Sequence, residues 1–200
     1  MGDLDETISG AVEQAKESRL NSVIALLVAI AATLMALDNI KDGNVAQAMG
    51  QAQSHALDSW SLYQAKSTKQ NLAAAMLDQL TVERAVLGGT TAPEARALLD
   101  QKIAAYSADA KRYAGEKEAI KKTAEGYQAD YDHLNVHDDQ FDLAEAFLSI
   151  SIALFGITAL TRKRAMLVVA AVFAALGCLF GLSGFLGWSL HPDFLAQLLS

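Results

Sequence analysis

Three stretches without a charged residue interrupt an otherwise polar chain. They cover residues 20–37, 146–161 and 165–192. A helix that crosses a bilayer needs roughly 20 mostly apolar residues, with about 17 as the lower limit. The second stretch reaches this length when it begins at Leu143, which places Glu145 near the lipid headgroups. We therefore predict membrane-spanning helices over residues 20–37, 143–160 and 165–187.

A secretory signal peptide is the alternative for the first stretch. Its leading segment is acidic, whereas the start of a signal peptide is basic. The acidic residues are Asp3, Asp5, Glu6, Glu13 and Glu17, against Lys16 and Arg19. No convincing small-x-small cleavage site follows. We expect an uncleaved anchor, preceded by an amphipathic segment over residues 1–19.

Heptad periodicity dominates the polar residues between the first two predicted spans. Apolar positions alternate by three and four along the second half of this region, as in a coiled coil. They are Leu99, Ile103, Tyr106, Ala110, Tyr113, Lys117, Ile120, Ala124, Tyr127, Tyr131, Leu134, Asp138 and Phe141, with Lys117 and Asp138 as polar members. The first half carries a looser stripe from Val45 to Leu80. Two long helices that face each other explain both patterns.

The sequence also marks where one helix ends and the next begins. Gly88 and Gly89 suit a helix C-cap, and the segment from Thr91 to Glu94 matches a capping box with proline in the first turn. We predict an all-α fold: three transmembrane helices, with an antiparallel, coiled-coil-like hairpin over residues 38–142 that turns near 88–93. A kink is expected at residues 42–44, while the second hairpin helix continues into the second span.

Cations near the span ends predict the orientation. Residues 161–164 connect the second and third spans and contain Arg162, Lys163 and Arg164. Because cytoplasmic loops are enriched in Lys and Arg, this loop belongs in the cytoplasm, and Lys16 and Arg19 place the N-terminus on the same side. The hairpin and the tail over residues 188–200 are then extracytoplasmic.

Composition and motifs exclude several functions. The net charge of −7 and the single basic cluster argue against nucleic acid. Cys178 is the only cysteine, so no disulfide framework or thiolate metal site is available within the chain. Nucleophile, general-base and phosphate-loop signatures are absent. We expect no enzyme activity, no cofactor and no small-molecule substrate.

Three segments carry a resemblance to a known family. They are residues 60–69 (WSLYQAKSTK), 139–146 (DQFDLAEA) and 160–164 (LTRKR). With them the chain resembles, from about residue 10 to 186, a bacterial membrane protein family known as domain of unknown function 4337. The resemblance implies the same order of span, hairpin and two closing spans, and a location in the bacterial cytoplasmic (inner) membrane. It implies no activity, cofactor or catalytic residue.

Two groups of side chains are candidates for ion binding. His133 and His137 have the i, i+4 spacing with which two imidazoles grip one transition metal, and Asp130 or Asp138 is an oxygen ligand nearby. No third histidine or thiolate is close in sequence, so a hydrated polar helix is the favoured interpretation. The carboxylates before the second span are Asp138, Asp139, Asp142 and Glu145. We expect a continuous helix to splay them, and charge asymmetry explains them more simply.

Interaction residues are predicted in the spans and in the hairpin. Glu145 lies where an ionised carboxylate needs a partner or a path to water. Gly177 and Gly181 form a small-x-x-x-small pattern that suits close packing, either on the other spans or on a second chain. Ala25, Ala29, Ala32 and Ala36 give the first span a similar face.

Trp60, Tyr63, Lys66 and Lys69 form the most distinctive local motif of the hairpin. As a recognition patch, the aromatic rings anchor a partner and the lysines steer it. The favoured alternative is that both rings fill the seam between the two helices while the lysines are solvated.

The leading functional hypothesis is a non-enzymatic, membrane-anchored interaction protein. It is a self-assembling homo-oligomer or an accessory subunit of a larger membrane complex, with the lipid bilayer as its surroundings. The alternative is a divalent-ion sensor or transport accessory protein that uses His133 and His137. Calorimetric titration with zinc, nickel and calcium separates the two.

Cysteine labelling tests the predicted orientation. Gly89→Cys is expected to react with a membrane-impermeant thiol reagent added outside spheroplasts, whereas Arg164→Cys is expected to remain unlabelled. The reverse pattern would invert the topology.

Overall fold

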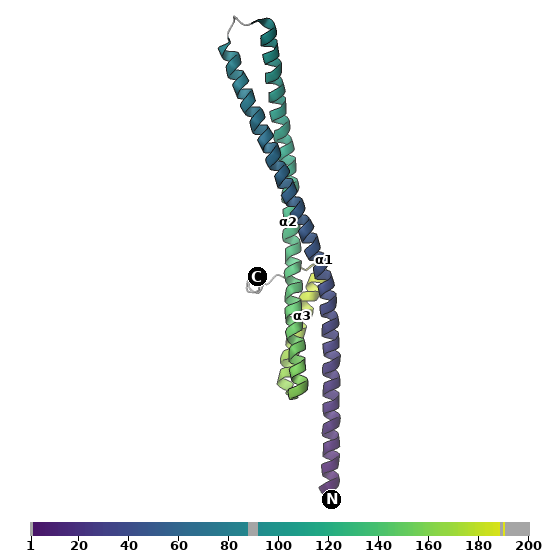
Figure 1. Ribbon diagram of the computed structural model, residues 1–200. Coiled ribbons are helices and arrows are strands. Elements are labelled where there is room, and N and C mark those ends of the chain that lie inside the picture. Colours follow the sequence, from purple (N-terminus) through teal and green to yellow (C-terminus); the bar gives the residue numbers. More distant parts are fainter. Residues whose placement is uncertain (1, 88–91, 189, 191–200) are drawn as a thin grey trace. The chain divides into compact units, whose positions relative to one another are not determined.

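The computed structural model describes residues 2–87, 92–188 and 190. These residues form three helices and no strand: α1 (Gly2–Val86), α2 (Pro93–Thr161) and α3 (Arg164–Leu186) (Figure 1). The all-helical class predicted from the sequence is confirmed. The predicted turn at Gly88 and Gly89 and most of the predicted tail lie outside the described residues.

α1 is continuous through residues 42–44, so the helix does not end at the position of the predicted kink. A glycine inside a helix costs only about 1 kcal/mol relative to alanine. Its backbone still forms the regular i to i−4 hydrogen bonds, and no other group lies within 4 Å of the Cβ position of Gly43. One glycine therefore weakens α1 here without ending it.

Each of the three helices contains a stretch that is long and apolar enough to cross a membrane. The most apolar windows of α1, α2 and α3 have mean hydropathies of 2.3, 2.0 and 2.6. α2 passes from its polar first part into its apolar last part without a break. These properties are those of a membrane protein.

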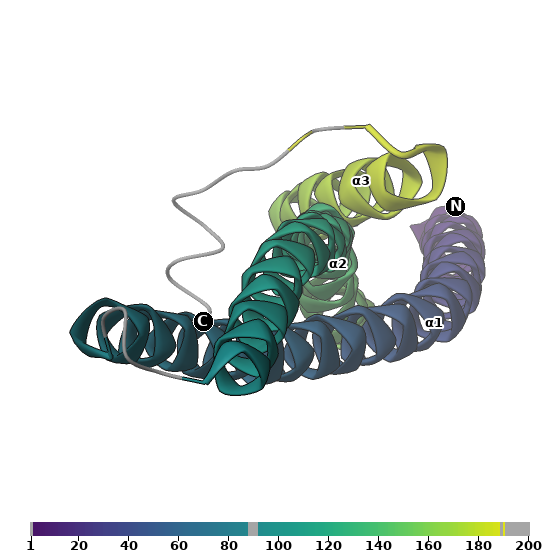
Figure 2. The same ribbon diagram turned by 90° about the horizontal axis from the view of Figure 1, so that it is seen from above.

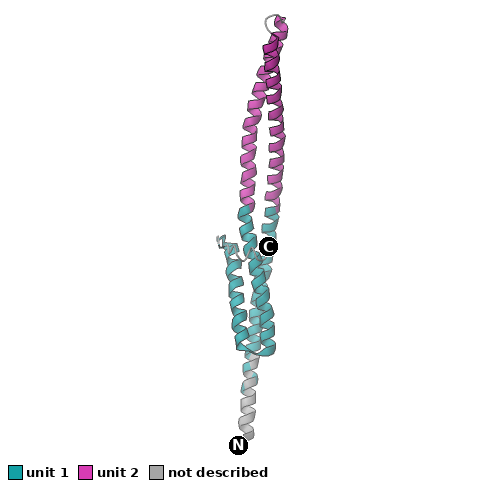
Figure 3. Cartoon of the chain, turned by 90° about the vertical axis from the view of Figure 1, so that its left-hand side faces the viewer, with its two compact units in different colours: residues 1–49, 132–200 teal, residues 50–131 magenta. Residues whose placement is uncertain are grey.

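The chain divides into two compact units, coloured separately in Figure 3. Unit 1 contains residues 1–49 and 132–200, and unit 2 contains residues 50–131. Unit 1 includes the three apolar stretches, whereas unit 2 consists of the polar middle parts of α1 and α2.

Unit 1 is held together by apolar contacts among all three helices. One cluster joins Ile24 of α1, Phe155 of α2 and Ala170 of α3, and another joins Leu143 and Ala144 to Phe180. Seen along the helices, α3 lies beside the last part of α2 (Figure 2). The connection from α2 to α3 is very short, and Arg162 within it adopts the left-handed conformation with φ 58°.

A buried glutamine fixes the end of α3. The helix is capped by Gly187 with φ 68°, a conformation in which glycine is unstrained. Just beyond it, the Gln140 amide nitrogen donates to the carbonyl oxygens of Trp188 and Leu190, each at 2.7 Å. Gln140 is fully buried, so these bonds satisfy polar groups that would otherwise be costly to bury.

Unit 2 has small residues at its centre. Ala52, Ala56, Ala73 and Leu80 of α1 are buried, as is Ala124 of α2. The first four belong to the looser stripe predicted between Val45 and Leu80, and Ala124 is a predicted heptad position. Ser59, Lys66 and Gln70 interrupt the predicted stripe and are only half-buried. Close helix contact in unit 2 therefore depends on alanine.

The seam predicts different effects for two alanines of α2. Ala124 is 0% exposed, whereas Ala129 is exposed. Ala124→Asp forces a carboxylate into the seam and is expected to cost about 3 kcal/mol through overpacking and desolvation. Ala129→Asp is expected to cost less than about 0.5 kcal/mol. Hydrogen–deuterium exchange of residues 50–131 in the full-length protein measures both, and equal protection would contradict the seam.

Candidate functional site

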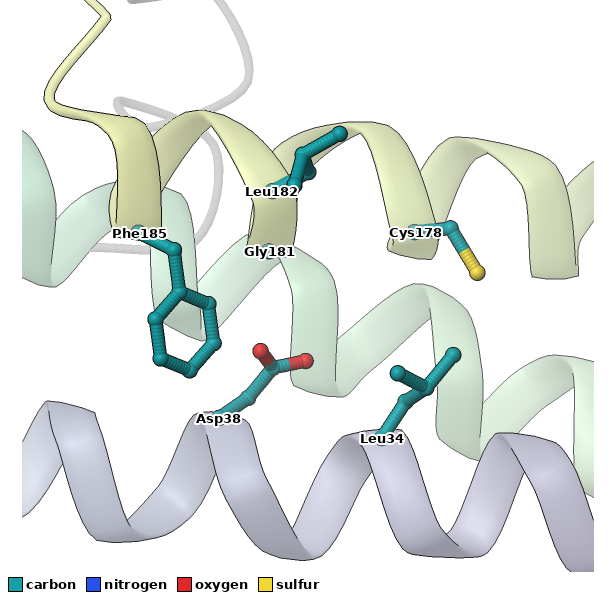
Figure 4. Close-up of a pocket in the computed structure, with 6 residues that line it drawn as sticks. All are labelled: Leu34, Asp38, Cys178, Gly181, Leu182 and Phe185. Carbon is teal, nitrogen blue, oxygen red and sulfur yellow. The ribbon is translucent and has the colours of Figure 1, made fainter.

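Asp38 of α1 is the most unusual carboxyl group in unit 1. It follows directly after the charge-free residues 20–37, yet it is only 4% exposed. Its side chain points from α1 toward Gly181 of α3, between Leu34 and Phe185 (Figure 4). No hydrogen bond or ion pair to Asp38 occurs among the described residues. Asp38 is thus a buried acid without a partner in the part of the chain that the structure describes.

Glycines allow α3 to approach the other two helices. A Cβ atom at Gly181 would lie 2.7 Å from Asp38 Oδ1, and one at Gly177 would lie 2.7 Å from Leu148 Cγ. A Cβ atom at Gly184 would meet the Phe141 ring at the same distance. The small-residue face of α3 is therefore used inside the chain. Ala25, Ala29, Ala32 and Ala36 of α1, in contrast, are exposed.

Two hollows lie along α1 and share Leu34. The first has a volume of about 250 Å³ and is lined by Leu34, Asp38, Cys178, Gly181, Leu182 and Phe185. The second has a volume of about 270 Å³ and is lined by Ala29, Ile30, Thr33 and Leu34. Both are open-sided. Asp38 contributes the one carboxyl group of this otherwise mostly apolar lining.

Further acids gather one helical turn beyond Asp38. Burial, followed by the charges of Asp138 and Asp142, raises the pKa of Asp42 to about 6, and Asp42 and Asp138 share a hydrogen bond. Burial and the charge of Asp142 also raise the pKa of Asp138. We expected a continuous helix to splay these acids, and this was wrong for Asp138 and Asp142. Because they are spaced i, i+4, they share the face of α2 that approaches Asp42.

The histidine pair is engaged in packing and hydrogen bonding. The rings of His133 and His137 contact each other edge to face, with centroids 5.0 Å apart. His137 Nδ1 lies 3.2 Å from Gln140 Oε1. Since the Gln140 amide nitrogen already serves two carbonyls, Oε1 is the acceptor and His137 the donor. Among the described residues, no group of three or more His, Cys, Asp or Glu side chains has an arrangement suited to a metal ion.

The aromatic and basic motif of α1 contacts α2 within unit 2. Tyr63 stacks edge to face with Trp60 and lies beneath the ammonium group of Lys117, which is 5.7 Å from its ring centre. Lys66 forms a salt bridge with Glu116, and this bond is the main reason for the lowered pKa of Glu116. Lys66 is therefore half-buried and paired within the chain, whereas Lys69 is exposed.

Glu145 is exposed on α2, and no ion pair within the described residues involves it. It adds to the negative charge around Asp42. Glu145 thus has no ion-pair partner among the described residues. Its predicted need for a partner or a path to water stays a prediction.

Asp38 and Gln140 are the functional candidates that sequence reasoning missed. The signal for Asp38 was its i, i+4 spacing to Asp42, which places two acids on one helix face beside an apolar stretch. Gln140 lies in segment 139–146, which carries the family resemblance, but no local pattern indicated its role, because its carbonyl partners follow α3, about fifty positions later in the chain.

The raised pKa of Asp42 predicts a pH-dependent stability. Its ordinary value is 3.8 and its value in the folded chain is about 6, so the folded state binds more protons between these limits. The resulting stability is full below about pH 4 and is lost as the pH rises through about 6. Asp42→Asn should raise the melting temperature by about 3 °C at pH 7.5 and hardly at all at pH 4. Asp58→Asn, at an exposed site of unit 2, is the control, and a pH-independent effect of Asp42→Asn would refute the interpretation.

Comparison with known proteins gives one match. The model of a family described as Domain of unknown function (DUF4337) matches residues 20–187. No curated protein and no solved structure matches the chain. The matched residues include all three apolar stretches and both helices of unit 2. The resemblance noted in the sequence is confirmed, and the chain belongs to the DUF4337 family.

Proposed function

We propose that this protein is a multi-pass protein of the bacterial inner membrane that acts by binding other protein chains through an extracytoplasmic helical hairpin. It is either a homo-oligomer or an accessory subunit of a membrane complex. No catalytic step is part of this function.

Contacts within unit 2 support the hairpin. Arg84 pairs with Asp100, Lys66 pairs with Glu116, and the ring of His55 lies 5.1 Å from that of Tyr127. From one pair to the next, the residue number in α1 falls while the residue number in α2 rises, as expected for two antiparallel helices. The first of these pairs lies next to the predicted turn.

The charges beside the apolar stretches support the orientation. Arg162, Lys163 and Arg164 are exposed between α2 and α3. At the other end of these stretches lie Asp38, Asp42, Asp138 and Asp142. This asymmetry favours a cytoplasmic side at residues 161–164 and an extracytoplasmic hairpin.

The observation that carries the proposal is the exposed aliphatic surface of α1 in unit 2. Leu57, Leu72, Val82 and Val86 are 62%, 63%, 63% and 79% exposed, and Leu62 is also exposed. In the α2 part of the unit, Leu98 is the one large aliphatic residue with comparable exposure among the described residues. At about 100° per residue, Leu57, Leu72, Val82 and Val86 share one face of α1, and exposed aliphatic groups gathered in this way on a polar domain favour a protein partner.

The distribution of charge makes this face more distinctive. Residues 50–86 carry six charged side chains, whereas residues 93–131 carry fourteen. Exposed, uncharged side chains recur every seven residues on α1, at Ser54, Ser61, Thr68, Ala75 and Val82. Such a row permits close approach by another helix, and its low charge suits a second copy of the same row.

Leu72→Glu tests this face. A glutamate there should weaken association about tenfold, because it replaces the burial of a leucine with a desolvated charge. Light scattering and chemical cross-linking of the full-length protein in mild detergent give the oligomeric state. Gln101→Glu, at an exposed site of α2, adds the same charge and should have no effect.

The outcomes separate the two forms of the proposal. A homo-oligomer that Leu72→Glu dissociates supports self-assembly. A monomer that loses one defined membrane partner on the same substitution supports an accessory subunit. A monomer without any co-purifying protein in either variant would rule out both.

A further inference from the structure

Leu34 borders both hollows, and we call the hollow that Asp38 lines the Asp38 groove. Leu34 and Asp38, one helical turn apart on α1, form one of its walls, and the hollow at Ala29, Ile30 and Thr33 adjoins it at Leu34. Leu182 and Phe185 of α3 form its other wall at the Asp38 end. The groove is thus apolar along its length and acidic at one end.

The carboxylate at the acidic end needs a cation or water as a partner. Without one, an ionised carboxylate beside an apolar stretch costs free energy. Asp38 has no hydrogen bond or ion pair among the described residues, and it is 96% shielded by the surrounding side chains. Figure 4 shows the carboxylate among the residues that line the hollow, and the open side of this hollow is the direction from which a cation can approach.

We propose that the Asp38 groove binds a phospholipid with a primary-amine headgroup from the surrounding bilayer. The ammonium group donates hydrogen bonds to the Asp38 carboxylate. One acyl chain lies along Leu34, Ile30 and Ala29. The site is formed within unit 1 and does not depend on the binding face of unit 2.

The position of each part of the groove matches the depth of each part of a lipid. Asp38 follows the last residue of the apolar stretch 20–37, where headgroups begin. The apolar lining extends from there toward the middle of the same stretch, where acyl chains lie. A soluble ligand would have to enter through lipid to cover this lining.

Charge favours a zwitterionic headgroup over an anionic one. Asp42 and Asp138 add negative charge one turn beyond Asp38, which attracts an ammonium group. Lys41 is exposed on the same side of α1 as Leu34, seven residues away, and forms no ion pair among the described residues. Lys41 is therefore available for the lipid phosphate.

Lipid titration of the full-length protein tests the proposal. Phosphatidylethanolamine, phosphatidylcholine and phosphatidylglycerol with identical acyl chains are added to the protein in nonionic detergent, and bound lipid is counted by native mass spectrometry. Phosphatidylethanolamine is expected to bind about tenfold more tightly than the other two, because it alone carries a cationic group that donates hydrogen bonds to a carboxylate. Equal binding of the three lipids would overturn the proposal.

Two variants connect the preference to the site. Asp38→Asn should abolish the preference for phosphatidylethanolamine, whereas Asp58→Asn, in unit 2, should retain it. A preference that survives Asp38→Asn would overturn the proposal.

A competition experiment needs no substitution and remains informative if Asp38→Asn does not fold. Hexadecylamine should displace phosphatidylethanolamine from the unaltered protein, while hexadecanol, which has the same chain without the charge, should not. Equal displacement by both would show that Asp38 does not contribute. Binding of hexadecylamine without any binding of phosphatidylethanolamine would also overturn the assignment to a lipid.

Discussion

The close approach of α3 to α1 and α2 is the interaction on which unit 1 depends. At Gly177, Gly181 and Gly184, any side chain would collide with an atom of a neighbouring helix. In a bilayer, where burying apolar surface gains little, such contact and the dispersion energy that accompanies it hold helices together. The same approach covers Asp38, and it brings the end of α3 to the carbonyl contacts with Gln140.

Glycine and aspartate therefore form one arrangement at the Asp38 end of the groove. A side chain at position 181 would displace the carboxylate from its present place. Without Asp38, the hollow would be a simple apolar notch of the kind that lipid fills without selectivity. The proposed selectivity for an amine headgroup thus depends on Asp38 of α1 and Gly181 of α3. Asp38 supplies the charge, and Gly181 leaves the space that the carboxylate occupies.

Local sequence patterns predicted the helices well, whereas contacts between distant segments were hard to predict. Helical periodicity identified buried positions of unit 2, with Ala73 and Leu80 in the looser stripe and Ala124 in the heptad pattern, because periodicity is a local property. Helix α1 continues through Gly43, because a single glycine weakens a helix without ending it. Asp38 was missed because its burial depends on Gly181, which lies on a helix far along the chain.

The hydrogen bonds from Gln140 to the backbone beyond α3, which we call the Gln140 clamp, affect which residues of this segment can be substituted. The Gln140 amide recognises the backbone oxygens of residues 188 and 190, which every amino acid possesses. The side chains at these two positions are therefore free to change without loss of the bonds, and both are exposed. Gln140 itself has no such freedom, since a shorter or charged side chain would lose the reach or the donor. Sequence drift should concentrate on the clamped residues, while the residue that clamps them is retained.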